Sequence, residues 1–181
     1  GRELLYQYCR DRGVAHRCCG KLVIATTDEE SATLQGYADT ARRNGVTDLE
    51  WLTPVAVAAL EPAVRCTAAL WSPSTGIVSS HELMQALLGD LESQRGTLAC
   101  RAEVVGARLV RDAHAVRVRH DETHSEFTTR LLVNAAGLHA QSLAHRLEGL
   151  DADTIPALYL AKGQYFTLQG RAPFNHLVYP V

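Results

Sequence analysis

The 181-residue chain lacks the features that would place it in several special classes of protein. No apolar stretch is long enough to cross a bilayer, and the first residues lack the apolar core of a signal peptide. Eighteen basic residues against twenty acidic ones leave a formal charge of -2, which gives no strong attraction to nucleic acid. We therefore expect no nucleic-acid partner and no transmembrane segment in this chain.

Cysteine is scarce, and its spacing does not favour metal binding or a disulfide framework. The five cysteines are odd in number, and none forms a C-x-x-C pair. Adjacent Cys18 and Cys19 would point to opposite faces of a strand. His120 and His124 flank an expected turn, where their spacing does not favour a metal site. We expect reduced thiols in a cytoplasmic protein, with no metal bound.

The composition is that of an ordinary globular protein, with 46% hydrophobic and 21% charged residues. Helices are expected at 2–12, from Thr27 to about 44, from Thr53 to about 61, from Ser79 to about 96, and at 138–147. Strands are expected at 16–25, around 68–78, in several short runs between 98 and 134, at 158–170 and at 176–181. Turns between the short runs are expected near Asp112 and Asp121. This mixture predicts an α+β fold.

The stretch LLVNAAGLHA, residues 131–140, has two interpretations. Gly137 can supply a tight turn from strand to helix, because glycine adopts backbone angles that other residues avoid. Alternatively, the small residues allow a phosphate-bearing dinucleotide to approach the backbone. The order of helix, strand, antiparallel strands and strand before this stretch favours a nucleotide-binding sheet covered by an insertion.

No G-x-G-x-x-G follows an expected strand, so the usual pyrophosphate-binding turn is missing from these residues. The chain also has no initiator methionine and stops within an expected strand. We expect it to be a piece of a longer protein that supplies the missing turn.

Four motifs in order, CGKLVIAT, SPSTGIVSSHEL, NAAGLHA and KGQYF, resemble the D-amino-acid-oxidase-type FAD-dependent flavoproteins. The branch that the chain resembles most is the L-2-hydroxyglutarate dehydrogenase or oxidase group. This resemblance implies FAD as cofactor. It implies that FAD lies against Val133, Asn134, Ala135, Ala136, Gly137 and Leu138, and that Val104 lines the adenine. Ser79 stands where the family often has Asp.

The resemblance also implies a division into two incomplete domains. Residues 1–15 and 79–149 would belong to the FAD-binding domain, and residues 16–78 and 150–181 to the substrate domain. The reaction expected of the longer protein is oxidation of a small 2-hydroxy acid to the 2-oxo acid, with L-2-hydroxyglutarate as the expected substrate. The electron acceptor is open between oxygen and a quinone. Membrane association through another segment also stays open.

No catalytic residue is identified from the sequence, and Tyr165 and His176 are the candidates. They belong to a group of polar residues near the C-terminus that also contains Lys162, Arg171 and Tyr179. Each has a structural alternative, since Tyr165 and Tyr179 suit a half-buried sheet and His176 suits a loop. Two other functions remain: an amine-oxidising relative acting on glycine, sarcosine or a D-amino acid, and a non-catalytic fragment or binding module. We expect no turnover by these 181 residues alone.

Overall fold

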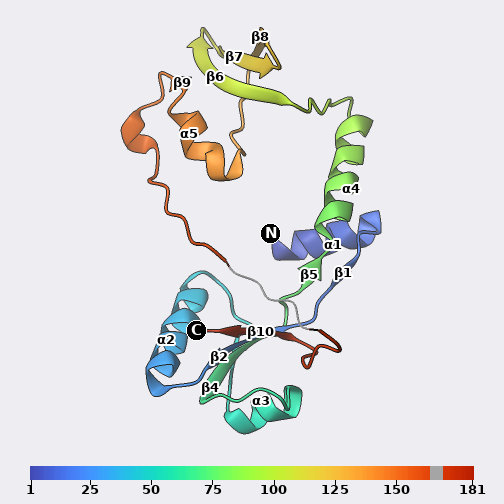
Figure 1. Cartoon of the computed structure of the whole chain (residues 1–181), viewed down its shortest axis with the longest axis vertical. Coiled ribbons are helices and arrows are strands. Elements are labelled where there is room, and N and C mark those ends of the chain that lie inside the picture. The colour runs from blue at the N-terminus through green and yellow to red at the C-terminus, as the bar shows by residue number, and fades with distance from the viewer. Residues whose placement is uncertain (164–168) are drawn as a thin grey trace. The chain divides into compact units, whose positions relative to one another are not determined.

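The computed structural model describes residues 1–163 and 169–181, which form two compact units. Unit 1 contains Gly1–Gly96 together with the C-terminal segment through Val181, and unit 2 begins at Thr97. Both units mix helices with strands, which confirms the predicted α+β class (Figure 1). The two units cut across the predicted division into FAD and substrate domains, because α4 (Ser80–Ser93) belongs to unit 1 and the strands after it to unit 2. That functional division stays a prediction.

Unit 1 is built on a four-stranded mixed sheet. In spatial order its strands are β10 (Leu177–Pro180), β2 (Lys21–Ala25), β4 (Ala68–Ser72) and β3 (Glu50–Leu52). β2 runs antiparallel to β4, with Leu22 opposite Trp71. β10 joins β2 in parallel, with Leu177 opposite Lys21. The last strand of the chain therefore completes a sheet that begins near the N-terminus.

Two helices of unit 1 begin at the residues that the sequence predicts. Thr27 precedes α2 (Asp28–Arg43), and its side chain accepts a hydrogen bond from the Glu30 N–H at 3.2 Å. Thr53 precedes α3 (Pro54–Leu60), with proline at the first helical position, where its missing N–H costs nothing. These caps satisfy backbone donors that the first turn of a helix leaves free.

α2 and α3 cover opposite faces of the four-stranded sheet (Figure 1). Leu34 of α2 is fully buried in one cluster with Leu70, and Val57 of α3 is fully buried in another with Ala69. Successive side chains of a strand point to opposite faces, so the neighbours Ala69 and Leu70 serve different cores. Each core is small, and the sheet depends on both.

The other two helices of unit 1 are α1 (Arg2–Arg12) and α4 (Ser80–Ser93). The Tyr8 hydroxyl on α1 donates a hydrogen bond to the Asp90 carboxylate on α4 at 2.7 Å, and this bond raises the pKa of Tyr8. Beside them, β1 (His16–Arg17) pairs antiparallel with β5 (Ile77–Val78).

Unit 2 contains a three-stranded antiparallel meander with a short fourth strand. The strands are β8 (Thr123–Thr129), β7 (Ala113–His120), β6 (Ala102–Val110) and β9 (Leu147–Glu148), in spatial order. Both hairpin turns fall where the sequence predicts them, and Arg111 and Asp121 adopt positive φ there. A bulge between Val104 and Gly106 interrupts the pairing of β6 with β7.

The segment after β8 differs from the prediction. Residues 131–136 form no regular secondary structure, although a strand through Val133 was expected. The expected helix at 138–147 is reduced to a 3₁₀ turn (Gly137–His139) and α5 (Ala140–Ala144). A strand needs a neighbour for its backbone hydrogen bonds, and no strand within 1–163 or 169–181 pairs with residues 131–133.

The strand expected at 158–170 is also not found where the chain is described. Residues 158–163 have no regular structure, and the middle of the expected strand lies outside the described residues. The strand expected at 176–181 is confirmed as β10. β10 has β2 as a neighbour, whereas no strand in the described parts pairs with residues 158–163.

Candidate functional site

Unit 2 contains a cavity of about 580 Å³ between β6 and the segment that follows β8. Its lining residues are Glu103, Val104, Leu132, Val133, Asn134, Ala135, Ala136, His139, Leu143 and Arg146. Five of the seven residues predicted to contact FAD are among them: Val104, Val133, Asn134, Ala135 and Ala136. The fold thus brings Val104 of β6 beside a turn that lies about thirty residues later in the sequence. Contact of these residues with a cofactor stays a prediction.

Gly137 and Leu138, the other two predicted contacts, are not among the residues that line this cavity. Gly137 has φ +56°, and a Cβ placed there would meet nothing within 4 Å. The left-handed backbone conformation therefore accounts for a glycine at this position, which is the first of the two interpretations of this stretch. Leu138 is 70% exposed. Open space beside Gly137 still leaves room for a ligand to approach.

Both ends of the Asn134 side-chain amide form hydrogen bonds with backbone groups of the same turn. Its Nδ2 donates to the Ala140 carbonyl at 2.8 Å, and its Oδ1 accepts from the Ala136 N–H at 3.3 Å. The side chain is half-buried. It therefore holds the backbone that carries Ala135 and Ala136, the smallest side chains around the cavity.

Charged side chains meet at one edge of the cavity. Glu103 bonds the Arg119 guanidinium of β7, and its other oxygen lies 3.7 Å from Arg146 Nη1. The hydrogen bond from Arg119, its charge, and Arg146 hold the pKa of Glu103 below its usual range. The same carboxylate raises the pKa of Arg119. The one acidic side chain around the cavity is thus balanced by two cations.

These residues fit the adenosine part of a dinucleotide. Apolar side chains from β6 and residues 132–136 offer a surface for a planar ring, and the alanines let it approach the backbone. α5, which follows this turn, has only 5 residues and is too short to offer a helix N-terminus to the phosphates. The fit depends on the cavity and its small side chains alone.

Of the two catalytic candidates, Tyr165 lies outside the described residues, and His176 is held by a buried acid. His176 Nδ1 lies 2.6 Å from Glu61 Oε1. The same oxygen accepts the backbone N–H groups of Asn175 and His176, each at 2.7 Å. The His176 ring also meets Trp71 edge-on, with ring centroids 5.0 Å apart. His176 is therefore part of a packed arrangement and not a free loop residue.

Glu61 is the residue that sequence reasoning missed. Its side chain is fully buried at the end of α3, and Oε2 has no hydrogen-bond partner among the described residues. Burial raises the pKa of Glu61, but the bonds from His176 and Asn175 outweigh burial and lower it overall. The only sequence signal is a glutamate at a helix end before Pro62. That pattern is common and does not predict a distant partner.

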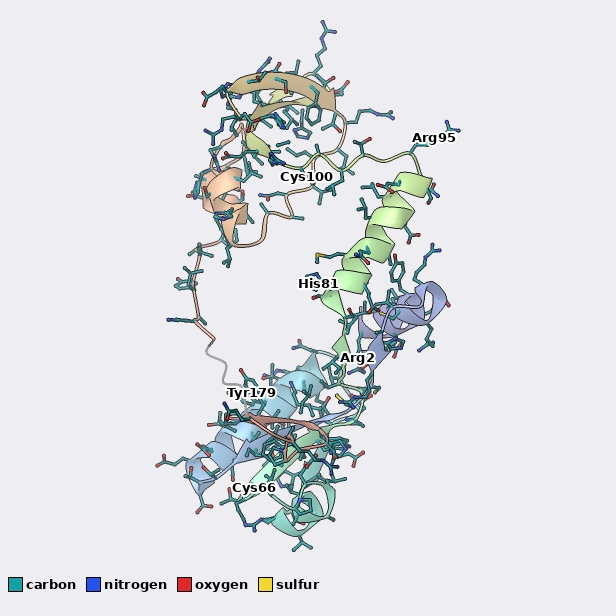
Figure 2. The ribbon with its side chains drawn as sticks, turned by 45° about the vertical axis from the view of Figure 1, so that its right-hand side comes forward. Arg2, Cys66, His81, Arg95, Cys100 and Tyr179 are labelled. Atoms are coloured by element: carbon teal, nitrogen blue, oxygen red, sulfur yellow. The ribbon has the colours of Figure 1, made fainter. Side chains whose placement is uncertain are left out.

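The other described polar residues near the C-terminus are exposed. Tyr179 lies on β10 (Figure 2). It has 64% of its surface exposed, and Arg171 is also exposed. Lys162 is an exposed residue of unit 2. The described residues contain no group of three or more metal-ligating side chains. No described helix is both long and apolar enough to span a membrane.

Comparison with known proteins identifies relatives over the whole chain. The chain is 34% identical to the mitochondrial L-2-hydroxyglutarate dehydrogenase of Arabidopsis thaliana over 210 aligned residues. The alignment covers all of this chain and 44% of that protein. It is 28% identical to the L-2-hydroxyglutarate dehydrogenase of Escherichia coli K12, again over the whole chain and 42% of the relative. The chain thus spans less than half the length of these curated relatives.

Solved structures share the fold. L-α-glycerophosphate oxidase from Mycoplasma pneumoniae, solved with FAD bound, matches 99% of the chain and 47% of its own length, with a TM-score of 0.75 and 19% identity. Glycine oxidase from Geobacillus kaustophilus matches 80% of the chain and 40% of its own length, with a TM-score of 0.64 and 25% identity. The family model described as FAD dependent oxidoreductase, DAO, matches residues 1–181. The chain belongs to this family of FAD-dependent oxidoreductases.

Proposed function

We propose that the protein containing this chain oxidises a small 2-hydroxy acid with FAD, converting L-2-hydroxyglutarate to 2-oxoglutarate. The observation that carries the substrate is the chain-long similarity to L-2-hydroxyglutarate dehydrogenases, at 34% identity in one case. The observation that supports the cofactor is family membership together with the cavity lined by Val104 and residues 133–136.

In this proposal the cavity of unit 2 holds the adenosine half of FAD. Val104 and Val133 supply apolar contact, and Ala135 and Ala136 allow close approach to the backbone. The FAD-binding domain would then contain residues 1–15 and 79–149. The substrate domain would contain residues 16–78 and 150–181. When bound, FAD would supply a hydride acceptor.

Oxidation of a 2-hydroxy acid also needs a cation for the carboxylate and a base for the hydroxyl proton. His176 is a candidate base, because neutral imidazole accepts a proton near neutral pH and Glu61 would stabilise the resulting cation. Tyr165 is kept as a second candidate. Oxygen and a quinone remain the candidate electron acceptors.

The test is reduction of the flavin in the purified full-length gene product. Anaerobic addition of L-2-hydroxyglutarate should bleach the visible flavin absorption, and the D-enantiomer should bleach it far more slowly. A flavin that no 2-hydroxy acid reduces would overturn the proposed reaction. Loss of all flavin from a folded protein would overturn the proposed cofactor site.

An amine oxidation is the second candidate, because glycine oxidase is among the structures that share this fold, at 25% identity. The same anaerobic experiment separates the two, since glycine, sarcosine or a D-amino acid would then bleach the flavin and 2-hydroxyglutarate would not.

We propose that this protein lies in the cytoplasm, although the Arabidopsis relative is described as mitochondrial.

A further inference from the structure

The turn at residues 134–140 contains a side chain that connects its two ends. Asn134 reaches forward to the Ala140 carbonyl at 2.8 Å and to the Ala136 N–H at 3.3 Å. A donor to a carbonyl must be the amide nitrogen, and an acceptor from an N–H must be the amide oxygen. The two partners together fix the orientation of the amide.

The backbone between these two contacts has little else to hold it. Residues 131–136 pair with no strand in the described parts of the chain, and Gly137 adopts a left-handed conformation at φ +56°. An asparagine that bonds the N–H two residues ahead closes a local turn, and its second bond ties that turn to the start of α5. Ala135 and Ala136 lie inside this closed segment and line the cavity.

We propose that Asn134 is a positioning residue, which shapes the turn so that the backbone at Ala135 and Ala136 meets the bound dinucleotide. Its amide oxygen is occupied within the protein, as is one of its two amide hydrogens, so it acts through the turn and not as the main ligand of FAD. This inference rests on the proposed function, because it assigns a role toward FAD in the same cavity.

Asparagine suits this role for a specific chemical reason. Aspartate has the same shape and keeps the acceptor for Ala136, but when ionised it has no donor for the Ala140 carbonyl. Leucine has nearly the same size and makes neither bond. An aspartate that becomes protonated regains an O–H donor, so acid should restore what the ionised form has lost.

The experiment measures the dissociation constant of FAD for the full-length gene product, prepared without flavin, at pH 7.5 and pH 4.5. At pH 7.5 Asn134→Asp and Asn134→Leu should each bind FAD roughly tenfold more weakly than wild type. The dissociation constant of Asn134→Asp divided by that of wild type should fall about threefold or more between pH 7.5 and pH 4.5. The reason is that the pKa of a carboxyl facing a carbonyl oxygen lies above the usual value of about 3.9. The Leu variant should show no such recovery.

A matched control is Gln141→Leu, which removes another half-buried amide close to the same turn. The Gln141 Oε1 has no hydrogen-bond partner among the described residues, so this variant should bind FAD like wild type. Hydrogen exchange gives a second readout. The amides of residues 135–140 should exchange faster in both Asn134 variants, while those of β6 and β7 stay protected.

The outcomes are distinct. Wild-type affinity in both Asn134 variants would overturn the positioning role and leave the proposed cofactor site intact. A weakened Asp variant without recovery at pH 4.5 would also overturn the role, because the missing donor would not be the cause. A folded wild-type protein that binds no FAD would overturn the proposed function, and this inference with it.

Discussion

The fully buried carboxylate of Glu61 binds Asn175 and His176, which lie 114 and 115 residues further along the chain. Three donors converge on its Oε1, from the backbone of Asn175 and from the backbone and ring of His176. These contacts immediately precede β10, so one side chain fixes where the last strand enters the sheet. A buried carboxylate is stable only when it is hydrogen-bonded, and this one is, at one oxygen.

The lowered pKa of Glu61 makes part of the stability of unit 1 depend on pH. Because the folded-state pKa lies below the unfolded value of about 4.3, the contribution is fully present above that value. It is lost as the pH falls through the folded-state pKa, when the carboxylate becomes protonated in the folded protein as well.

We expect Glu61→Gln to lower the free energy of unfolding at pH 7 by about 1–3 kcal/mol, because a neutral amide is a weaker acceptor for three donors. The difference from wild type should shrink as the pH falls below the unfolded pKa of about 4.3. Urea unfolding at pH 7 and pH 3.5 measures both. Asp39→Asn, which breaks an exposed ion pair with Arg42, is the control and should change little at either pH. Equal effects of Glu61→Gln at both pH values would contradict the assignment.

Ala136 and Gly137 are adjacent, yet their substitution should have opposite consequences. Ala136 has φ −78°, which any residue adopts, and lines the cavity, so Ala136→Leu should block FAD with little loss of stability. Gly137 has φ +56° and open space around it, so Gly137→Ala should cost about 1 kcal/mol of stability and leave FAD affinity nearly unchanged. Thermal unfolding and FAD titration of both variants check this. The reverse pattern would move the cofactor contact to Gly137.

At the scale of elements, β1 and β2 show why one expected strand became two. The sequence from His16 to Ala25 reads as a single strand, but Gly20 adopts φ +70° and interrupts it. A Cβ at Gly20 would overlap the ring of Trp71, which packs against the core on β4. Two requirements, conformation and space, therefore select glycine at this position.

Gly20→Ala should consequently destabilise unit 1 by more than Gly45→Ala does. Gly45 also has positive φ, at +78°, but a Cβ there would meet nothing within 4 Å, so its cost should be the conformational one of about 1 kcal/mol. Displacing Trp71 should raise the cost at Gly20 to about 3 kcal/mol or more. Chemical denaturation of the two variants compares them directly. Similar losses would mean that Trp71 moves aside freely.

At the scale of the whole molecule, the chain has the family fold but spans only 42–44% of two of its dehydrogenase relatives. Its 181 residues contain no G-x-G-x-x-G turn. Within unit 1, the apolar side chains Met84 and Leu87 of α4 are exposed, at 58% and 51%.

We therefore expect the 181-residue chain alone to be catalytically inactive. Mixed with FAD and then desalted, it should show no reduction of any retained flavin by L-2-hydroxyglutarate, whereas the full-length gene product should. Visible absorption spectra of both proteins make the comparison. Bleaching of retained flavin by the short chain would show that the missing turn is dispensable.

The sequence by itself determined the local elements and the family. Thr27, Thr53-Pro54 and the turn residues near 112 and 121 mark boundaries that the structure confirms, because caps and turns depend on neighbours within a few residues. Four motifs in order were sufficient to indicate the flavoprotein family, which the family model then confirmed.

The tertiary structure alone decided what depends on distant partners. It showed that Glu61 binds His176, that Asn134 is engaged with its own turn, and that residues 131–133 form no strand. A buried acid is recognised only when its donors are known, and a strand exists only beside another strand. Both conditions are set by segments far apart in the sequence, which local pattern and periodicity do not report.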